Sequence, residues 1–201
     1  MDHDDSIALI RRHLEASAEV KRLAAASCAP AIAEAAGVLI EAFRHGGRLL
    51  LCGNGGSAAD CQHLAAEFVS SLNHARPRAA LGAVALTTDT SLLTANANDF
   101  GFEHVFERQV EALGRRGDVL IGISTSGNSA NVLRALERAR AQGLATIVLT
   151  GGGGGRAATS ADLAIRIPSE DTQHVQESHI AIGHVLCALV ERALFPNPNP
   201  A

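Results

Sequence analysis

Short apolar runs alternate with longer amphipathic segments along most of the chain. The runs at residues 48–52, 83–86, 118–124, 145–150 and 163–167 have the length and composition of buried strands. The segments at residues 57–73, 90–97, 102–113, 129–142 and 172–194 carry apolar residues at helical spacing. Because strand and helix patterns alternate, the sequence predicts an α/β fold with a parallel sheet covered by helices on both faces.

Two more helices are expected before the first strand. Residues 6–27 are amphipathic, and residues 30–45 begin near a proline and end at a glycine pair. These helices could pack on the sheet or on another subunit. We therefore divide the chain into N-terminal helices at 1–46, which belong to the same domain and form the oligomer interface, a main α/β body at 47–195, and a flexible proline-rich tail at 196–201.

Composition narrows the class of partner. The 201-residue chain has a formal net charge of −4 and contains neither Trp nor Tyr, so a basic nucleic-acid footprint and an aromatic stacking platform are not expected. The four cysteines form no CxxC pair, which indicates reduced, buried thiols. No apolar run reaches transmembrane length, and the acidic N-terminus lacks a signal-peptide core. We expect a soluble cytoplasmic protein without a nucleic-acid or membrane partner.

Two turns rich in serine and glycine follow predicted strands and precede predicted helices. They are CGNGGS at residues 52–57 and STSGNS at residues 124–129. Free backbone N–H groups at a helix N-terminus attract anions, and hydroxyl groups add hydrogen-bond donors. Neither turn contains lysine, so a sugar phosphate suits them better than a nucleoside triphosphate. Ordinary helix capping is the alternative for either turn alone, but two such turns favour phosphate binding.

Histidines and carboxylates form a candidate metal set. His63 and Glu67 share a helix face, and His184 lies in the last predicted helix. Gln176 lies about 80° around that helix from His184, and Glu177 aligns slightly better, so spacing alone does not choose between them. Two histidines, a carboxylate and a carbonyl could complete a tetrahedral zinc site. The alternative is a surface pair of His63 with Glu67 and a structural core histidine at 184.

Four longer motifs give the chain a family resemblance. They are GNGGSAADCQHLAAEF at 53–68, ALTTDTSLLTANANDFGFEHVFERQVEALG at 85–114, GDVLIGISTSGNSANVLRALERAR at 117–140 and VQESHIAIGH at 175–184. In this order and spacing they resemble the sedoheptulose 7-phosphate isomerases, or phosphoheptose isomerases, of the SIS (sugar isomerase) superfamily. The resemblance covers residues 47–195, and the leading helices also fit it.

The resemblance implies a single SIS domain with a five-stranded parallel sheet. It also implies a homotetramer whose active sites are shared between subunits. The implied reaction is the conversion of D-sedoheptulose 7-phosphate to D-glycero-D-manno-heptose 7-phosphate. This aldose–ketose isomerisation runs through an enediol and is the first committed step towards activated heptose, which serves lipopolysaccharide and other pathways.

The resemblance also assigns the site residues. It places one zinc ion per subunit on His63, Glu67, Gln176 and His184, which resolves the choice at position 176. Matching substrate contacts are Asn54, Gly55, Gly56, Glu67, Asn98, Asp99, Ser124, Thr125, Ser126, Ser129 and Gln176. Glu67 is then the catalytic base and His184 the acid or second proton carrier. Because Glu67 cannot easily be a firm ligand and a free base at once, either its metal bond loosens with substrate or the metal is structural.

Two other functions compete with this one. A non-catalytic SIS module that binds a replication-initiator protein is similar, but it lacks the carboxylate and histidine that match Glu67 and His184. Both residues are present here, which favours catalysis. The other alternative is an isomerase of another phosphosugar, or a sugar-phosphate-sensing regulator, although no DNA-binding domain is seen in the chain.

Overall fold

A five-stranded parallel sheet forms the centre of the computed structural model, which describes residues 2–73 and 77–196. The strand order is β2-β1-β3-β4-β5. The strands are β1 (Leu49–Gly53), β2 (Ala83–Ala85), β3 (Val119–Ile123), β4 (Ala145–Thr150) and β5 (Leu163–Arg166). The predicted α/β class and all-parallel sheet are therefore confirmed, and residues 197–201 of the predicted tail lie outside the described residues.

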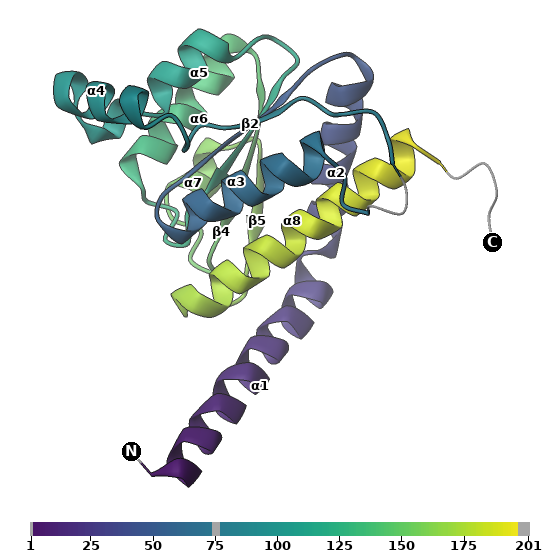
Figure 1. Cartoon of the computed structure of the whole chain (residues 1–201), viewed down its shortest axis with the longest axis vertical. Coiled ribbons are helices and arrows are strands. Elements are labelled where there is room, and N and C mark those ends of the chain that lie inside the picture. The colour runs from purple at the N-terminus through teal and green to yellow at the C-terminus, as the bar shows by residue number, and fades with distance from the viewer. Residues whose placement is uncertain (1, 74–76, 197–201) are drawn as a thin grey trace.

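Helices cover both faces of this sheet (Figure 1). Their bounds are α1 (His3–Ser27), α2 (Ala29–Arg44), α3 (Gly56–Val69), α4 (Thr90–Phe100), α5 (Glu107–Leu113), α6 (Ala130–Gln142), α7 (Ala157–Ser160) and α8 (Thr172–Leu194), with a 3₁₀ turn, η1, at Phe102–His104. Strand side chains alternate between two cores, since Leu49 and Leu51 join α2, α3 and α8, whereas Leu50 and Cys52 join α5 and α6.

The two N-terminal helices differ in burial. α1 projects away from the sheet (Figure 1), and of its residues only Ser17 and Ala24 are buried. α2 buries Ile32, Ala35, Ala36 and Leu39 against the sheet. No single helix among the described residues is long and apolar enough to cross a membrane. α1 and α2 reach that length and composition only when taken together, and they are bent by 70° where they meet.

α3 and α8 pack against each other (Figure 1). At Gly183 of α8, a Cβ atom would lie 2.4 Å from Cδ2 of the buried Leu64 side chain on α3, so a larger residue here would require Leu64 to shift. The contact matters for function because the predicted site residues His63 and Glu67 lie on α3, while Gln176 and His184 lie on α8.

Some element bounds differ from the prediction. The helix expected at 57–73 ends at Val69, because the Arg78 guanidinium donates to the carbonyl oxygens of Glu67 and Phe68 at its last turn. The helix expected at 102–113 is divided into a 3₁₀ turn and α5. The four-residue α7 was not predicted, because it is too short to show a helical period.

Candidate active site and metal centre

The two serine-glycine turns lie side by side at the carboxyl edge of the sheet. β1 pairs directly with β3, and Gly53 and Ile123, the last residues of the two strands, are register partners. The chain leaves β1 towards β2 on one side and returns to β3 on the other, so a topological switch point lies between them. Crevices at such points are the usual ligand sites of open parallel sheets.

Neither turn uses a side chain to cap the helix that follows it. Gly55 is the N-cap of α3 and Ser129 the N-cap of α6, and both caps lack a side-chain hydrogen bond. Ser129 Oγ instead lies 3.0 Å from Ser124 Oγ. The N-cap residues of the two helices therefore do not cap them through a side chain. The Val132 N–H is taken by Asn131 Oδ1 and the Ala58 N–H by the Asn54 and Gly55 carbonyl oxygens, so it is the N–H groups before these two that can meet an anion.

Backbone and amide contacts hold the two turns in place. The side-chain amides of Asn54 and Asn131 exchange two hydrogen bonds of 2.9 and 2.8 Å, which tie the first turn to α6. The Gly151 N–H donates to the Thr125 carbonyl at 2.9 Å, so the glycine run after β4 supports the second turn. Ser126 Oγ accepts from the Asn128 N–H at 3.2 Å and is exposed.

Three of the four predicted metal ligands converge between α3 and α8. Nitrogen atoms of His63 and His184 and a carboxylate oxygen of Glu67 lie within 4.8 Å of one another. Nε2 of His63 is 2.8 Å from Nε2 of His184 and 3.5 Å from Oε1 of Glu67. Two imidazole nitrogens and one carboxylate oxygen are a donor set that suits Zn²⁺, so the residues present fit the implied metal.

The structure separates the two candidate residues at the start of α8. Glu177 faces α1, where it lies 3.2 Å from His13 and 3.3 Å from Lys21 and accepts a hydrogen bond from Ser17. These partners, Ser17 foremost, lower the pKa of Glu177 to about 2. The Gln176 amide instead lies against the first turn of α3, at Gly56. Glu177 is thus occupied at another interface, and Gln176 faces the helix that carries His63.

Among the described residues, the group that could hold a metal contains His63, Glu67 and His184 but not the neighbouring cysteines or His179. Desolvation raises the pKa of Cys52 to about 12 and that of Cys61 well above its usual value, so both stay neutral thiols. His179 of α8 is fully buried, and desolvation lowers its pKa to about 4, so it is a neutral structural histidine. All four cysteines are free and buried, as predicted.

Sequence reasoning missed Asp60, which lies on the same stripe of α3 as the site residues. Gly56, Asp60, His63 and Glu67 follow one another at intervals of four, three and four residues, which brings them onto one helix face. Burial raises the pKa of Asp60, while His63 and a hydrogen bond from Gln176 lower it. The signal that could have found Asp60 was this spacing, one turn before His63.

Asn98 and Asp99 lie apart from the cluster. Both are exposed at the end of α4, where Asn98 Nδ2 donates to Asp99 Oδ1 at 2.8 Å. In Figure 1, α4 lies on the opposite side of the molecule from the C-terminal half of α8. Among the described residues, the printed contacts of His63, Glu67 and His184 do not include Asn98 or Asp99.

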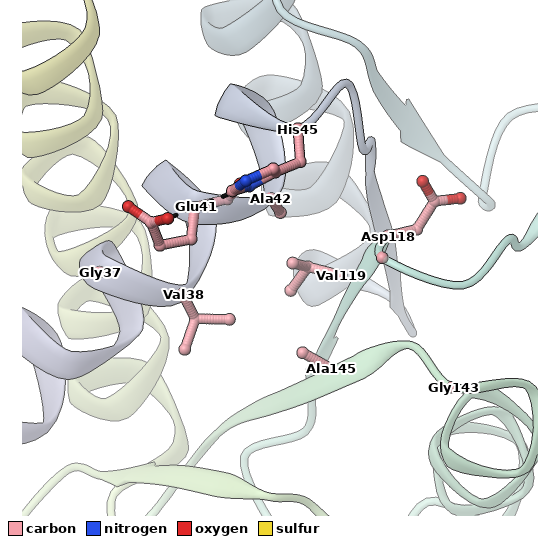
Figure 2. Close-up of a pocket in the computed structure, with 10 residues that line it drawn as sticks. Gly37, Val38, Glu41, Ala42, His45, Asp118, Val119, Gly143 and Ala145 are labelled. Carbon is pink, nitrogen blue, oxygen red and sulfur yellow. Dashed lines mark hydrogen bonds and ion pairs between the residues drawn. The ribbon is translucent and has the colours of Figure 1, made fainter.

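A large hollow also lies away from this site. A cavity of about 570 Å³ opens at the amino-terminal edge of β3 and β4, beside the end of α2 (Figure 2). Val38, Ala42, Val119 and Ala145 give it a mostly apolar lining, and Figure 2 shows the Glu41–His45 pair at its rim. Ligands of open parallel sheets bind at the carboxyl edge, so this cavity is not the candidate active site.

Known proteins resemble the chain over most of its length. Residues 13–151 match the model of the SIS domain. The phosphoheptose isomerase of Rhodospirillum rubrum is 60% identical over 83% of this chain and 88% of its own, and that of Aneurinibacillus thermoaerophilus is 50% identical over 94% and 95%. A solved phosphoheptose isomerase from Neisseria gonorrhoeae superposes with a TM-score of 0.86 at 43% identity and covers 92% of this chain and 97% of that one.

Proposed function

The chain belongs to the phosphoheptose isomerases of the SIS domain family and is an aldose–ketose isomerase that converts D-sedoheptulose 7-phosphate to D-glycero-D-manno-heptose 7-phosphate, and we propose that it does so through an enediol in a zinc-containing site. Relatives at 50–60% identity carry this name, which favours it over a non-catalytic module or an isomerase of another phosphosugar.

One observation carries the proposed mechanism. His63 and Glu67 of α3 meet His184 of α8 within 4.8 Å, although His63 and His184 are 121 residues apart along the chain. An isomerase needs a base near carbon and an acid near oxygen, and this cluster holds a carboxylate and two imidazoles.

Glu67 is the base of the proposed mechanism. It takes the proton from C1 of the ketose and returns it to C2, which gives the aldose. His184 moves a proton between the oxygens on C1 and C2 as the enediol forms and collapses. Zinc held by His63, Glu67, Gln176 and His184 would polarise the carbonyl and stabilise the developing negative charge of the enediolate.

The two turns bind the rest of the substrate in this proposal. Ser124, Thr125, Ser126 and Ser129 take the phosphate, helped by the N–H groups of α6 that precede Val132, whose own N–H is bonded to Asn131 Oδ1. Gly55 and Gly56 offer backbone N–H groups at the start of α3, and Asp99 binds sugar hydroxyls with Asn98 beside it. Asn54, also assigned to hydroxyls, has its side-chain amide paired with Asn131, so its backbone is the part left to contact the sugar.

We also propose that the enzyme is a homotetramer with shared active sites. Leu9, Ile10 and Leu14 on α1 are exposed to 50, 57 and 63%, which is a helix face suited to burial against other copies. The proposed setting is the cytoplasm, where the product supplies activated heptose for lipopolysaccharide or related glycans.

Isomerisation in D₂O tests the enediol. A proton held on Glu67 exchanges with solvent, because its side chain is 22% exposed. After many turnovers the aldose 7-phosphate should carry deuterium at C2, and the recovered ketose should carry it at C1. Mass spectrometry and ¹H NMR of both sugars measure this. Full conversion with no deuterium at either carbon would instead indicate a direct hydride shift and would contradict the role of Glu67 as base.

A further inference from the structure

The glycine run at residues 151–155 packs backbone to backbone against the second turn. A Cβ atom on Gly155 would lie 2.5 Å from the Ser126 carbonyl oxygen, and one on Gly151 would lie 2.7 Å from the Thr125 carbonyl oxygen. A backbone oxygen cannot swing aside as the end of a flexible side chain can. The two segments therefore approach this closely only because these positions carry no side chain.

Four consecutive carbonyl oxygens of the second turn, those of residues 124–127, are hydrogen-bonded within the protein. Their donors, in order, are the N–H group of Gly127 at 3.0 Å, that of Gly151 at 2.9 Å, the side-chain amide of Asn128 at 3.0 Å and the N–H group of Ala157 at 2.9 Å. Two of these donors thus belong to the glycine run and to the first residue of α7, which follows it. The run fixes the direction of every second carbonyl in this stretch.

The turn is left with hydrogen-bond donors for a ligand. Among the described residues, the backbone N–H groups of Thr125, Ser126 and Ser129 have no hydrogen-bond partner. The same three residues carry hydroxyl groups, and Ser126 is exposed. An anion binds to N–H and O–H donors and is repelled by a carbonyl oxygen, so a turn with its carbonyls engaged and its donors free suits a phosphate.

Asn128 joins the turn to the end of the glycine run through its side chain. Its Nδ2 donates to the Ser126 carbonyl at 3.0 Å, and its Oδ1 accepts from the Arg156 N–H at 3.1 Å. Both ends of the amide are therefore used, one on each segment. This bridge can be removed by mutation without placing a side chain between the two backbones.

Other contacts anchor the glycine run itself. The Arg166 guanidinium donates to the Gly152 carbonyl at 2.9 Å, and the Gly152 N–H donates to the Ser169 carbonyl at 3.0 Å. Gly153 differs from its neighbours, since it is exposed and a Cβ atom there would come no closer than 3.6 Å to Oε1 of Glu170. A methyl group would fit at this position without touching the second turn.

We propose that Gly155 is a positioning residue for the substrate phosphate: the close approach that it permits lets the glycine run hold the carbonyl oxygens of the second turn away from the anion and leave its donors facing it. The inference rests on the proposed phosphate site and adds to it a segment outside the turn. Gly155 acts through the turn and does not itself contact the phosphate.

Gly155→Ala tests this role, with Gly153→Ala as the matched control in the same run. At residue 155, φ is 55°, and the new methyl group would meet the Ser126 carbonyl, so the turn must shift. We expect KM for sedoheptulose 7-phosphate and the calorimetric Kd of inorganic phosphate each to rise about 10–100-fold, because hydrogen bonds to a charged group are weakened. The kcat should change little, since the proposed base and acid lie on α3 and α8. Gly153→Ala should leave all three constants unchanged.

Asn128→Ala keeps the proposal testable if Gly155→Ala fails to fold by circular dichroism. It removes the bridge alone, and both constants should rise about tenfold. Parental KM and phosphate Kd in a folded Gly155→Ala or Asn128→Ala protein, or a lower kcat with unchanged phosphate Kd, would overturn the proposal.

The phosphate measurement separates this proposal from the proposed reaction. A parent chain that binds phosphate but does not isomerise the sugar would contradict the isomerase, while a weaker phosphate Kd in Gly155→Ala but not in Gly153→Ala would still support the positioning role. A folded parent chain that binds no phosphate would overturn the phosphate site and this proposal with it.

Discussion

Replacing Glu67 with Gln will lower kcat for isomerisation of sedoheptulose 7-phosphate by about 10²–10⁴-fold. The amide keeps the shape of the side chain and its place next to His63, 3.5 Å away in the parent, but it cannot take a proton from carbon. A positioned base contributes about this factor to a proton transfer, so its removal should affect kcat rather than the fold. Aldose formation at saturating substrate measures the change.

Two controls belong with that experiment. Glu34→Gln, an exposed change on α2, should retain parental kcat. Because Glu67 is also a proposed metal ligand, zinc content is measured and the variant is assayed again with zinc in excess. A zinc-loaded Glu67→Gln protein with activity within tenfold of the parent would contradict the assignment of Glu67 as base.

Replacing Arg78 with Ala will lower the free energy of unfolding by about 3–5 kcal/mol. The Arg78 side chain is only 3% exposed, and its Nε donates to Oε1 of Glu191 at 2.7 Å. Its other nitrogens bind the carbonyl oxygens of Glu67 and Phe68 at 2.8 Å. The substitution leaves the Glu191 carboxylate buried without its cation and the end of α3 uncapped. Urea unfolding at matched protomer concentration measures the loss.

An exposed pair on α2 is the matched control for Arg78. Arg44 and Glu41 are 2.7 Å apart, the same separation, but their side chains are 51 and 59% exposed. Arg44→Ala should therefore cost about 1 kcal/mol or less, because water replaces a surface partner cheaply. Equal losses for Arg78→Ala and Arg44→Ala would show that burial does not set the strength of the Arg78 contact.

The sheet was predictable because its signals are local. Five apolar runs of four to seven residues, separated by amphipathic segments, give the strands and their parallel arrangement without any distant information. Helix ends were less predictable, as at Val69, where the last turn of α3 meets Arg78 from the connection that leads to β2. Contacts between residues far apart leave no periodic trace in the sequence.

The site was predictable in its residue types but not in its pairing. Spacing placed His63 beside Glu67, yet it could not choose between Gln176 and Glu177, because that choice depends on α1. His13, Ser17 and Lys21 surround Glu177 on one side of α8, and Gly56 leaves room for Gln176 on the other. The division of the chain at residues 46 and 195, and the roles of individual site residues, remain predictions.

Isomerase activity before and after removal of the metal tests the central claim most directly. The chain is assayed on sedoheptulose 7-phosphate as purified, after chelation, and after zinc is restored. We predict that activity falls with the chelator and returns with zinc, because His63, Glu67, Gln176 and His184 would then act as one metal-dependent site. Undiminished activity in protein shown to be free of metal would contradict a catalytic zinc, and no activity in folded, zinc-loaded protein would contradict the isomerase.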